Sequence, residues 1–403
     1  MSIMFRVSFF LVTALAVLGF AGRGEAAFLG DTVKPFISVA EIYDSNLFRV
    51  KDSAQLEAAL GDDRLGDFMT MLDFGTRVHY SVGRQELNLL LKKDFQFYSH
   101  YTGQNVDNEE VSGDLSLVFL DALRVRVDGG YLTAPESRVD YRAVAVNERT
   151  TLTGGISLGY QMPSGLAFEG SYRYYEVDYS LQEYKPNEYS RDTYTGKISY
   201  RISENATAYA SYQRDNTDYP HDMQIGALPV NNSSVADSFR VGLEKSVIPK
   251  TALSCYVGYL DRRHQQASSR DFSGVIGKVE AKYAVTGKIG LILNFERQLY
   301  EETYVDWIYS VTDAFGLGLS YAITEKIKAT LFNRLTWKDF QNVTGTGVPK
   351  RNDFLHEMNI GVEWAPIDRL TVNLGYQYSM RNSDEDNLNF DDHMVMANIA
   401  YRY

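Results

Sequence analysis

The chain has 403 residues, of which 44% are apolar and 13% aromatic, with 9 prolines and one cysteine. This composition is that of an ordered protein, because disordered and collagen-like chains contain few aromatic residues or far more proline. A single cysteine excludes an internal disulfide and paired-cysteine metal sites, and a net charge of −12 argues against nucleic acid as a partner.

The first 26 residues have the pattern of a secretory signal peptide. Arg6 precedes an apolar run that ends at Phe20, and Ala26 completes a small-x-small cleavage site. The apolar run is about a dozen residues, shorter than the roughly 20 that a helical membrane span needs. We therefore predict a signal peptide at residues 1–26 and one exported domain at residues 27–403, with no helical span.

The first predicted strand, residues 36–43, leads into a short polar and apolar segment. Asp44 and Asn46 favour a turn where the strand leaves its sheet, and Leu47 and Phe48 can then fold over the rim. A calcium site at Asp44 is the second interpretation of this segment, although we predict no metal or other cofactor.

The segment FISVAEIYDSNLFRV at 36–50 resembles the start of the putative beta-barrel porin 2 family. In that family an opening strand runs into a Tyr-Asp-x-Asn-(Leu/Ile)-(Phe/Tyr) signature, which corresponds here to Tyr43, Asp44, Asn46, Leu47 and Phe48. The family includes outer-membrane barrels encoded beside exopolysaccharide biosynthesis genes. The resemblance therefore implies a role in exporting or assembling a surface polysaccharide, with polysaccharide and export-complex proteins as partners.

Strand-like alternation continues along the whole chain. In residues 123–131, Leu123 and Val125 alternate with Arg124 and Arg126, so one face is apolar and the other polar. Comparable segments lie at 36–43, 69–80, 86–98, 111–119, 150–161, 165–177, 193–202, 205–214, 236–246, 251–262, 272–284, 289–296, 307–321, 326–338, 354–364, 370–378 and 392–403. We predict about eighteen strands, with 16 as the alternative, each near the length of a tilted transmembrane strand.

Short polar links alternate with longer polar loops. The links fall near Gly83, Asp121, Ser164, Glu204, Pro249, Thr286, Glu325 and Asp368, and the loops at 45–66, 102–109, 134–148, 178–190, 215–234, 263–270, 299–306, 339–352 and 380–390. This alternation is typical of an outer-membrane barrel with short periplasmic turns and long external loops. A soluble propeller or sandwich is the alternative, but no blade signature is present. The predicted fold class is therefore all-β, a closed antiparallel transmembrane β-barrel.

The polar faces of these strands are predicted to line the lumen. They carry about fourteen basic and ten acidic residues by the alternation of inner and outer positions. The basic candidates are Arg124, Arg126, Arg173, Lys197, Arg201, Lys328 and Arg334. Paired structural ladders are one interpretation, and a weakly basic conduit that favours anions is the other.

The last strand ends in one apolar face, formed by Val395, Ala397, Ile399, Tyr401 and Tyr403. This face resembles the C-terminal signal that the barrel assembly machinery reads, which makes that machinery a partner. The remaining expected partners are outer-membrane lipid and lipopolysaccharide. The expected location is therefore the outer membrane of a Gram-negative cell.

No catalytic constellation is apparent in the sequence. The six histidines have no zinc-ligand spacing and none adjoins a nucleophile motif, so we predict a protein that is not an enzyme. The leading functional hypothesis is a porin-like conduit or assembly factor for exopolysaccharide export. The alternatives are a passive porin for small solutes and a closed structural or surface-binding barrel.

Overall fold

The computed structural model describes residues 32–139, 144–225, 228–244, 250–266, 268–301, 309–341 and 350–402. The predicted signal peptide, the link near Pro249 and Tyr403 lie outside these residues. Among the residues described, no helix is long and apolar enough to cross a bilayer.

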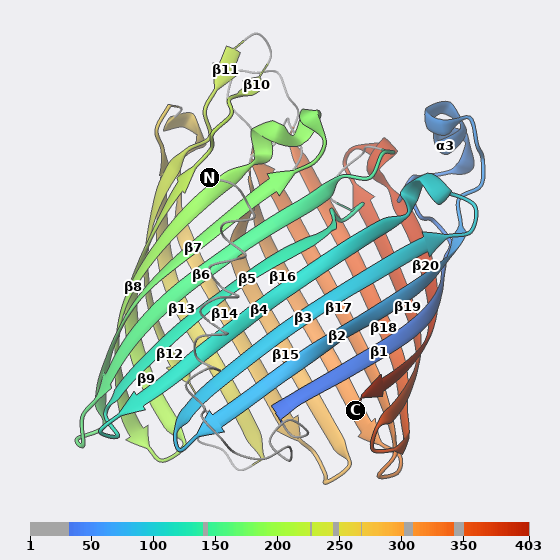
Figure 1. Ribbon diagram of the computed structural model, residues 1–403. Helices are drawn as coiled ribbons and strands as arrows, with labels where there is room; N and C mark the ends of the chain where they lie inside the picture. Colours follow the sequence, from blue (N-terminus) through green and yellow to red (C-terminus); the bar gives the residue numbers. More distant parts are fainter. Residues whose placement is uncertain are drawn as a thin grey trace.

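Eighteen antiparallel strands form one sheet that closes on itself (Figure 1). Closure is made by the first and last strands, which pair from Phe36 opposite Arg402 to Asp44 opposite Met394. The strands are β1 Val33–Asp44, β2 Asp67–Val82, β3 Gln85–Tyr98, β4 Val106–Phe119, β5 Leu123–Pro135, β6 Glu148–Gln161, β7 Leu166–Tyr179, β8 Tyr189–Ser203, β9 Ala206–Asp218, β12 Ser234–Glu244, β13 Thr251–His264, β14 Phe272–Ala284, β15 Ile289–Glu301, β16 Tyr309–Ala322, β17 Ile327–Gln341, β18 Arg351–Ile367, β19 Leu370–Ser383 and β20 Phe390–Arg402. The predicted closed barrel of eighteen strands is confirmed.

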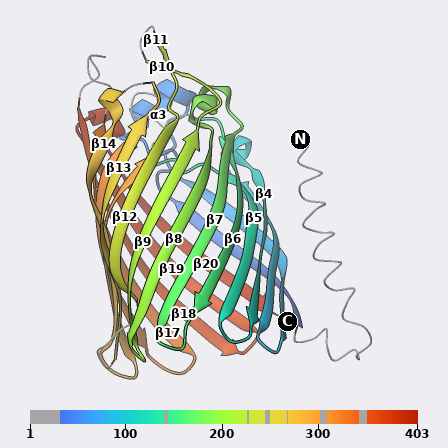
Figure 2. The same ribbon diagram turned by 90° about the vertical axis from the view of Figure 1, so that its left-hand side faces the viewer.

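Short turns lie at one end of the barrel and long loops at the other (Figures 1 and 2). The link between β2 and β3 is typical of the turn end, where Gly83 adopts a φ of 63° that favours glycine. The loop end carries the helix α3 (Ser53–Leu60) and a separate hairpin of β10 (Met223–Ile225) and β11 (Leu228–Val230). The predicted alternation of short and long connections is therefore confirmed for the described links.

Several strands extend further into the loop end than predicted. Strand β4 begins at Val106 instead of residue 111, β8 begins at Tyr189 instead of 193, and β19 ends at Ser383 instead of 378. The predicted loops at 102–109, 178–190 and 380–390 were accordingly too long. The apolar alternation stops where lipid contact stops, whereas backbone pairing can continue into water, so hydropathy alone underestimates strand length.

One ion pair identifies the inner face of the wall. Arg191 on β8 lies 2.9 Å from Glu301 on β15, and these two strands are not neighbours in the sheet. Their contact must therefore cross the interior. Because directly opposite residues of paired strands share a face, the registers that start from Arg191 extend this inner face around the barrel to Arg262 on β13 and Glu296 on β15. By alternation Glu301 shares the outer face of Phe295, and it meets Arg191 only because the end of β15 separates from β14.

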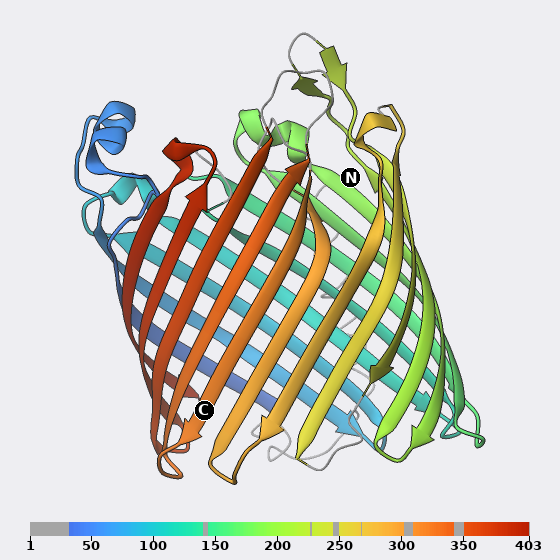
Figure 3. The same ribbon diagram turned by 180° about the vertical axis from the view of Figure 1, so that it is seen from behind.

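The opposite face is apolar and exposed on the isolated chain. Ile198, Val241 and Val257 are 53%, 44% and 54% exposed, as expected of side chains that contact lipid. Buried apolar clusters instead gather near the loop end, for example Leu47 with Phe48 and Leu56. The loop between β1 and β2, which carries α3 and is blue in Figure 3, is thus packed at the rim of the barrel.

Candidate functional site

The described residues form a cavity of about 490 Å³ inside the barrel, towards the loop end, which we call the lumenal cavity. Five tyrosines contribute to its lining. Its basic residues are Arg149, Arg191, Arg240, Arg262 and Lys338, and its acidic residues are Glu136, Asp215 and Glu301. Basic side chains therefore outnumber acidic ones around this space.

The ends of β15 and β16 close one side of the lumenal cavity because they separate from β14. The register of β14 with β15 ends where Gly277 stands opposite Arg297, whereas β15 stays paired with β16 as far as Glu301 opposite Tyr309. Strand β14 continues beyond that point with β13 alone. The hairpin end thereby brings Glu301 to residues of β8 and β13.

The Glu301 carboxylate is held by two arginines and a tyrosine. Arg191 Nη2 lies 2.9 Å from Oε1, and Arg262 Nη2 lies 3.0 Å from Oε1 and 3.1 Å from Oε2. The hydroxyl of Tyr219 donates to Oε2 at 3.2 Å. These are charge-assisted hydrogen bonds, which are stronger than bonds between neutral groups.

Tyr219 follows β9 in the loop end and is 4% exposed. Burial, and then the nearby charge of Glu301, raise the pKa of the Tyr219 hydroxyl well above its usual value. The hydroxyl therefore stays protonated over the physiological range. It acts as a permanent hydrogen-bond donor towards the carboxylate position.

Arg240 on β12 is another arginine of the lumenal cavity, besides Arg191 and Arg262. Its guanidinium lies 5.3 Å from the centre of the Tyr256 ring. Its Nε atom is buried and has no hydrogen-bond partner within the described part of the chain. No acid of the described part of the chain forms an ion pair with this guanidinium, so its charge can act on a solute anion.

All seven predicted lumen residues lie on the same face as Arg191 by the strand registers. They are Arg124, Arg126, Arg173, Lys197, Arg201, Lys328 and Arg334. They are spread around the wall, and none lines the lumenal cavity. Their role in selectivity stays a prediction.

Three of these seven are partly neutralised by acids on the adjacent strand or on the strand after it. Arg126 lies 3.8 Å from Asp114, Arg173 lies 3.4 Å from Asp128, and Lys197 lies 2.6 Å from Glu244. Side-chain exposure of Arg126 and Arg173 is 57% and 61%, so these pairs remain open to water and ions.

Sequence reasoning missed Arg149, Arg191, Tyr219 and Glu301 as site residues. All four lie just beyond the predicted strand limits, in segments predicted as loops or their borders. A usable signal exists for Arg191, because Arg191, Thr193, Thr195 and Lys197 continue one polar face at period two. No comparable pattern in the sequence indicates that Glu301 reaches β8.

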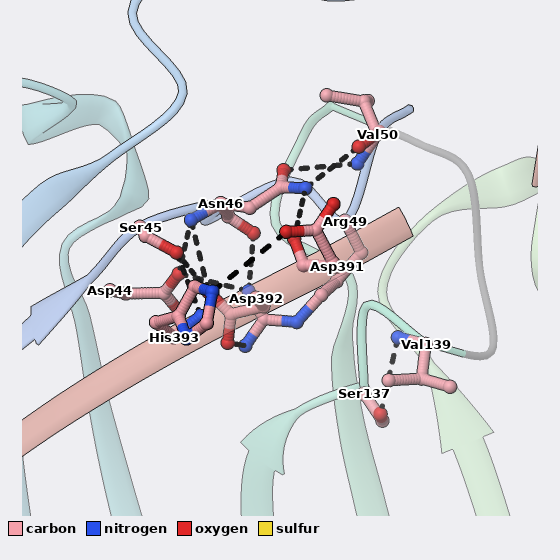
Figure 4. A network of polar contacts seen from close by, with 10 residues as sticks. All are labelled: Asp44, Ser45, Asn46, Arg49, Val50, Ser137, Val139, Asp391, Asp392 and His393. Carbon is pink, nitrogen blue, oxygen red and sulfur yellow. Dashed lines mark hydrogen bonds and ion pairs between the residues drawn. The ribbon is translucent and has the colours of Figure 1, made fainter. Parts of the chain in front are cut away.

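The Tyr-Asp-x-Asn signature forms a polar cluster at the loop-end rim, which we call the seam cluster (Figure 4). Asn46 N donates to Asp44 Oδ1 at 2.9 Å and to Asp392 Oδ1 at 3.0 Å. The Arg49 guanidinium lies 2.9 Å from Asp44 and 3.0 Å from Asp392. Asp392 belongs to the last strand, so the signature ties β1 to β20 where the barrel closes.

The calcium interpretation finds no support at Asp44. The positive charge between the Asp44 and Asp392 carboxylates comes from Arg49. Among the residues described, no group of three or more His, Cys, Asp or Glu side chains is arranged to hold a metal ion.

The rest of the signature packs on its surroundings. Leu47 and Phe48 are buried with Leu56 of α3, and the Phe48 ring meets the Tyr101 ring edge-on at 4.9 Å. Tyr43 lies on the outer face, 4.9 Å from the Phe68 ring. The signature thus anchors the first loop to the rim.

The predicted assembly signal lies on the outer face of the last strand. Val395, Ile399 and Tyr401 are 53%, 56% and 40% exposed, and Ala397 shares their face. Tyr403 lies outside the described residues. Recognition by an assembly machinery stays a prediction.

Comparison with known proteins gives one family and a set of similar folds. The family described as putative beta-barrel porin 2 matches residues 30–403. No curated protein matches the chain.

Three solved porins share the fold. Pseudomonas aeruginosa OccK2 (OpdF) in complex with glucuronate is 12% identical, with a TM-score of 0.53 over 92% of this chain and 98% of that one. A BenF-like porin from Pseudomonas fluorescens Pf-5 is 11% identical, with a TM-score of 0.51 over 92% and 99%. Pseudomonas aeruginosa OpdK with vanillate is 11% identical, with a TM-score of 0.50 over 93% and 99%.

Proposed function

Because the chain belongs to the putative beta-barrel porin 2 family, we propose that it is a passive channel with a preference for small anionic solutes. The protein is an integral β-barrel of the outer membrane, similar in fold to porins. The proposed preference for anions is based on the charges inside the barrel.

The observation that carries the proposal is the basic lining of the lumenal cavity. Five basic side chains face three acidic ones there, and Arg240 forms no ion pair with an acid of the described residues. An excess of one charge in a low-dielectric channel raises the local concentration of ions of the opposite sign. The seven predicted basic lumen residues would extend the same field along the wall.

The size of the lumenal cavity suits a single-ring solute. A volume of about 490 Å³ lies within the range of small-molecule sites. Tyrosines offer both apolar ring faces and hydroxyl groups to such a solute. Glucuronate and vanillate, present in two of the similar porins, are both ring carboxylates.

Export of a polysaccharide stays a prediction from the sequence resemblance. The family description and the similar folds name porins and no polysaccharide. The single-channel conductance of the purified protein, with and without added polysaccharide, separates the possibilities. If added polysaccharide blocks the channel current and small solutes do not, export is favoured. If the protein shows no conductance at all, a closed structural barrel is favoured.

The anion preference can be tested by the reversal potential in planar bilayers under a KCl gradient. We expect the wild type to favour chloride and the variant Arg240→Gln to shift towards potassium. Arg263→Gln is the matched control, because Arg263 is the outward-facing neighbour of Arg262 on β13 and is bound to Asp261. A wild type without anion preference would overturn the proposal.

A further inference from the structure

The two arginines that hold Glu301 are positioned independently of it. Arg191 Nε donates to Thr217 Oγ1 at 3.0 Å, and Arg262 Nε donates to Ser234 Oγ at 3.1 Å. Each guanidinium also lies over a tyrosine ring, at 5.2 Å from Tyr189 and 5.3 Å from Tyr309. Their Nη groups would therefore keep their orientation without the Glu301 carboxylate, as in a preorganised receptor.

Glu301 is tethered less firmly than the arginines. It is the last described residue of β15, and beyond Arg297 this strand is paired with β16 on one side only. A strand end with one ladder can move at lower cost than one paired on both sides. The Glu301 carboxylate can therefore move away from Arg191 and Arg262 and be replaced by another carboxylate.

The cluster formed by Arg191, Arg262 and Glu301 also carries more positive than negative charge. Arg270, on the η3 turn (Ser268–Arg270), is 2% exposed, and its Nε and Nη1 atoms have no hydrogen-bond partner in the described part of the chain. Burial, and then the charge of Arg262, lower the pKa of Arg270 to about 10. Asp215 and Asp271 also lie near these guanidinium groups, but they bond Thr193, Gln213 and the His264 backbone, so among the described acids Glu301 alone pairs directly with Arg191 and Arg262. The site can therefore accept a further anion.

We propose that Arg191 and Arg262 form a receptor for the carboxylate of a permeating ring acid, and that Glu301 is a resident carboxylate which the solute replaces. The inference rests on the proposed anion channel and adds a solute class and a specificity-determining residue. The solute carboxylate takes the bonds of Glu301, and its ring lies in the tyrosine-lined part of the lumenal cavity. Glu301 thus weakens binding and allows the solute to leave, as conduction requires.

The test measures the block of single-channel current by glucuronate and by glucose, which has the same ring without the carboxylate. The substitution Glu301→Gln removes the negative charge of the side chain that competes with the solute carboxylate. We expect the apparent Kd for glucuronate to fall roughly tenfold, a typical size for coupling between competing ligands, and the Kd for glucose to stay unchanged. Glu296→Gln is the matched control, since Glu296 is an inner-face acid of β15 outside the lumenal cavity.

An unchanged glucuronate Kd in Glu301→Gln, or an equal fall in Glu296→Gln, overturns the inference and indicates only a general field. If Glu301→Gln does not reach the membrane, Glu301→Asp decides, because the shorter side chain draws the competing carboxylate back from Arg191 and Arg262. A lower glucuronate Kd in Glu301→Asp supports the inference, and an unchanged one overturns it. The reversal potential of the wild type tests the proposed function separately in the same bilayers.

Discussion

At the scale of single residues, Arg49 is central to the seam cluster. It follows the family signature in the chain and bonds the signature residue Asp44. Its side chain is 10% exposed and lies between the carboxylates of Asp44 and Asp392, whose side chains are 11% and 0% exposed. Two buried carboxylates this close repel each other unless a cation separates them. The seam cluster therefore depends on a single guanidinium.

Replacing Arg49 with Gln is expected to cost about 3 kcal/mol of unfolding free energy, because it leaves a buried charge unpaired. The loss can be measured from the urea midpoint of the barrel in detergent, read by its mobility on gels with and without heating. Lys51→Gln is the control, since Lys51 pairs with the exposed Asp386 at the same rim. Equal midpoints for the two variants would remove the special role of Arg49.

Arg124 and Arg126 test the general field of the lumen. Both face inward, and the ion pair described for Arg126 is a long one, at 3.8 Å from the half-buried Asp114. Replacing both with Gln should shift the reversal potential towards cations and leave the melting temperature nearly unchanged, with a smaller shift at high salt because of screening. A lower melting temperature without a change in selectivity would show that the two arginines are structural.

At the scale of elements, the loop between β1 and β2 behaves as a small packed unit on the rim. Its helix α3 begins at Asp52, whose side chain accepts from Gln55 N, and ends at Gly61 in the left-handed conformation. Leu56 is fully buried against Leu47 and Phe48. The apolar half of the signature is therefore what holds this loop down.

Leu56→Ala should release the loop without opening the barrel, because the cavity that it creates lies outside the sheet. We expect trypsin added to intact cells to cleave after Lys51 or Arg64 much faster than in the wild type, while the heat-modifiable barrel remains. Leu60→Ala on the same helix is the control, since Leu60 is 37% exposed. Resistance of Leu56→Ala to trypsin would contradict this account of the loop.

At the scale of the whole molecule, the end that carries the long loops is expected to face the outside of the cell. The helix α3 and the hairpin of β10 and β11 lie at that end (Figure 1), and the lumenal cavity and the seam cluster are formed by residues near the strand ends there. The links described at the other end are short. A solute entering from outside would therefore meet the arginines of the lumenal cavity before the rest of the channel.

This orientation can be tested by labelling with an impermeant thiol reagent. The single native Cys255 faces outward on β13 and is replaced by Ser first. A cysteine at Asn387, exposed beside the η4 turn (Asp386–Leu388), should react on intact cells, and one at Glu204, in a short turn, should react only after permeabilisation. Labelling of Glu204→Cys on intact cells would invert the topology.

Alternation in the sequence predicts the closed barrel, a count of about eighteen strands and the inward face of the seven basic lumen residues. These follow from alternation at period two, which is a local property. A ten-residue window within a strand is enough to show it, as Arg124 and Arg126 illustrate. Only the tertiary structure decided which distant groups meet: Asn46 bonds Asp392 across 346 residues, and Arg191 meets Glu301 across 110. The reason is physical, since the closure of the sheet and the separation of β15 from β14 bring these residues together, and neither event leaves a periodic mark on the chain.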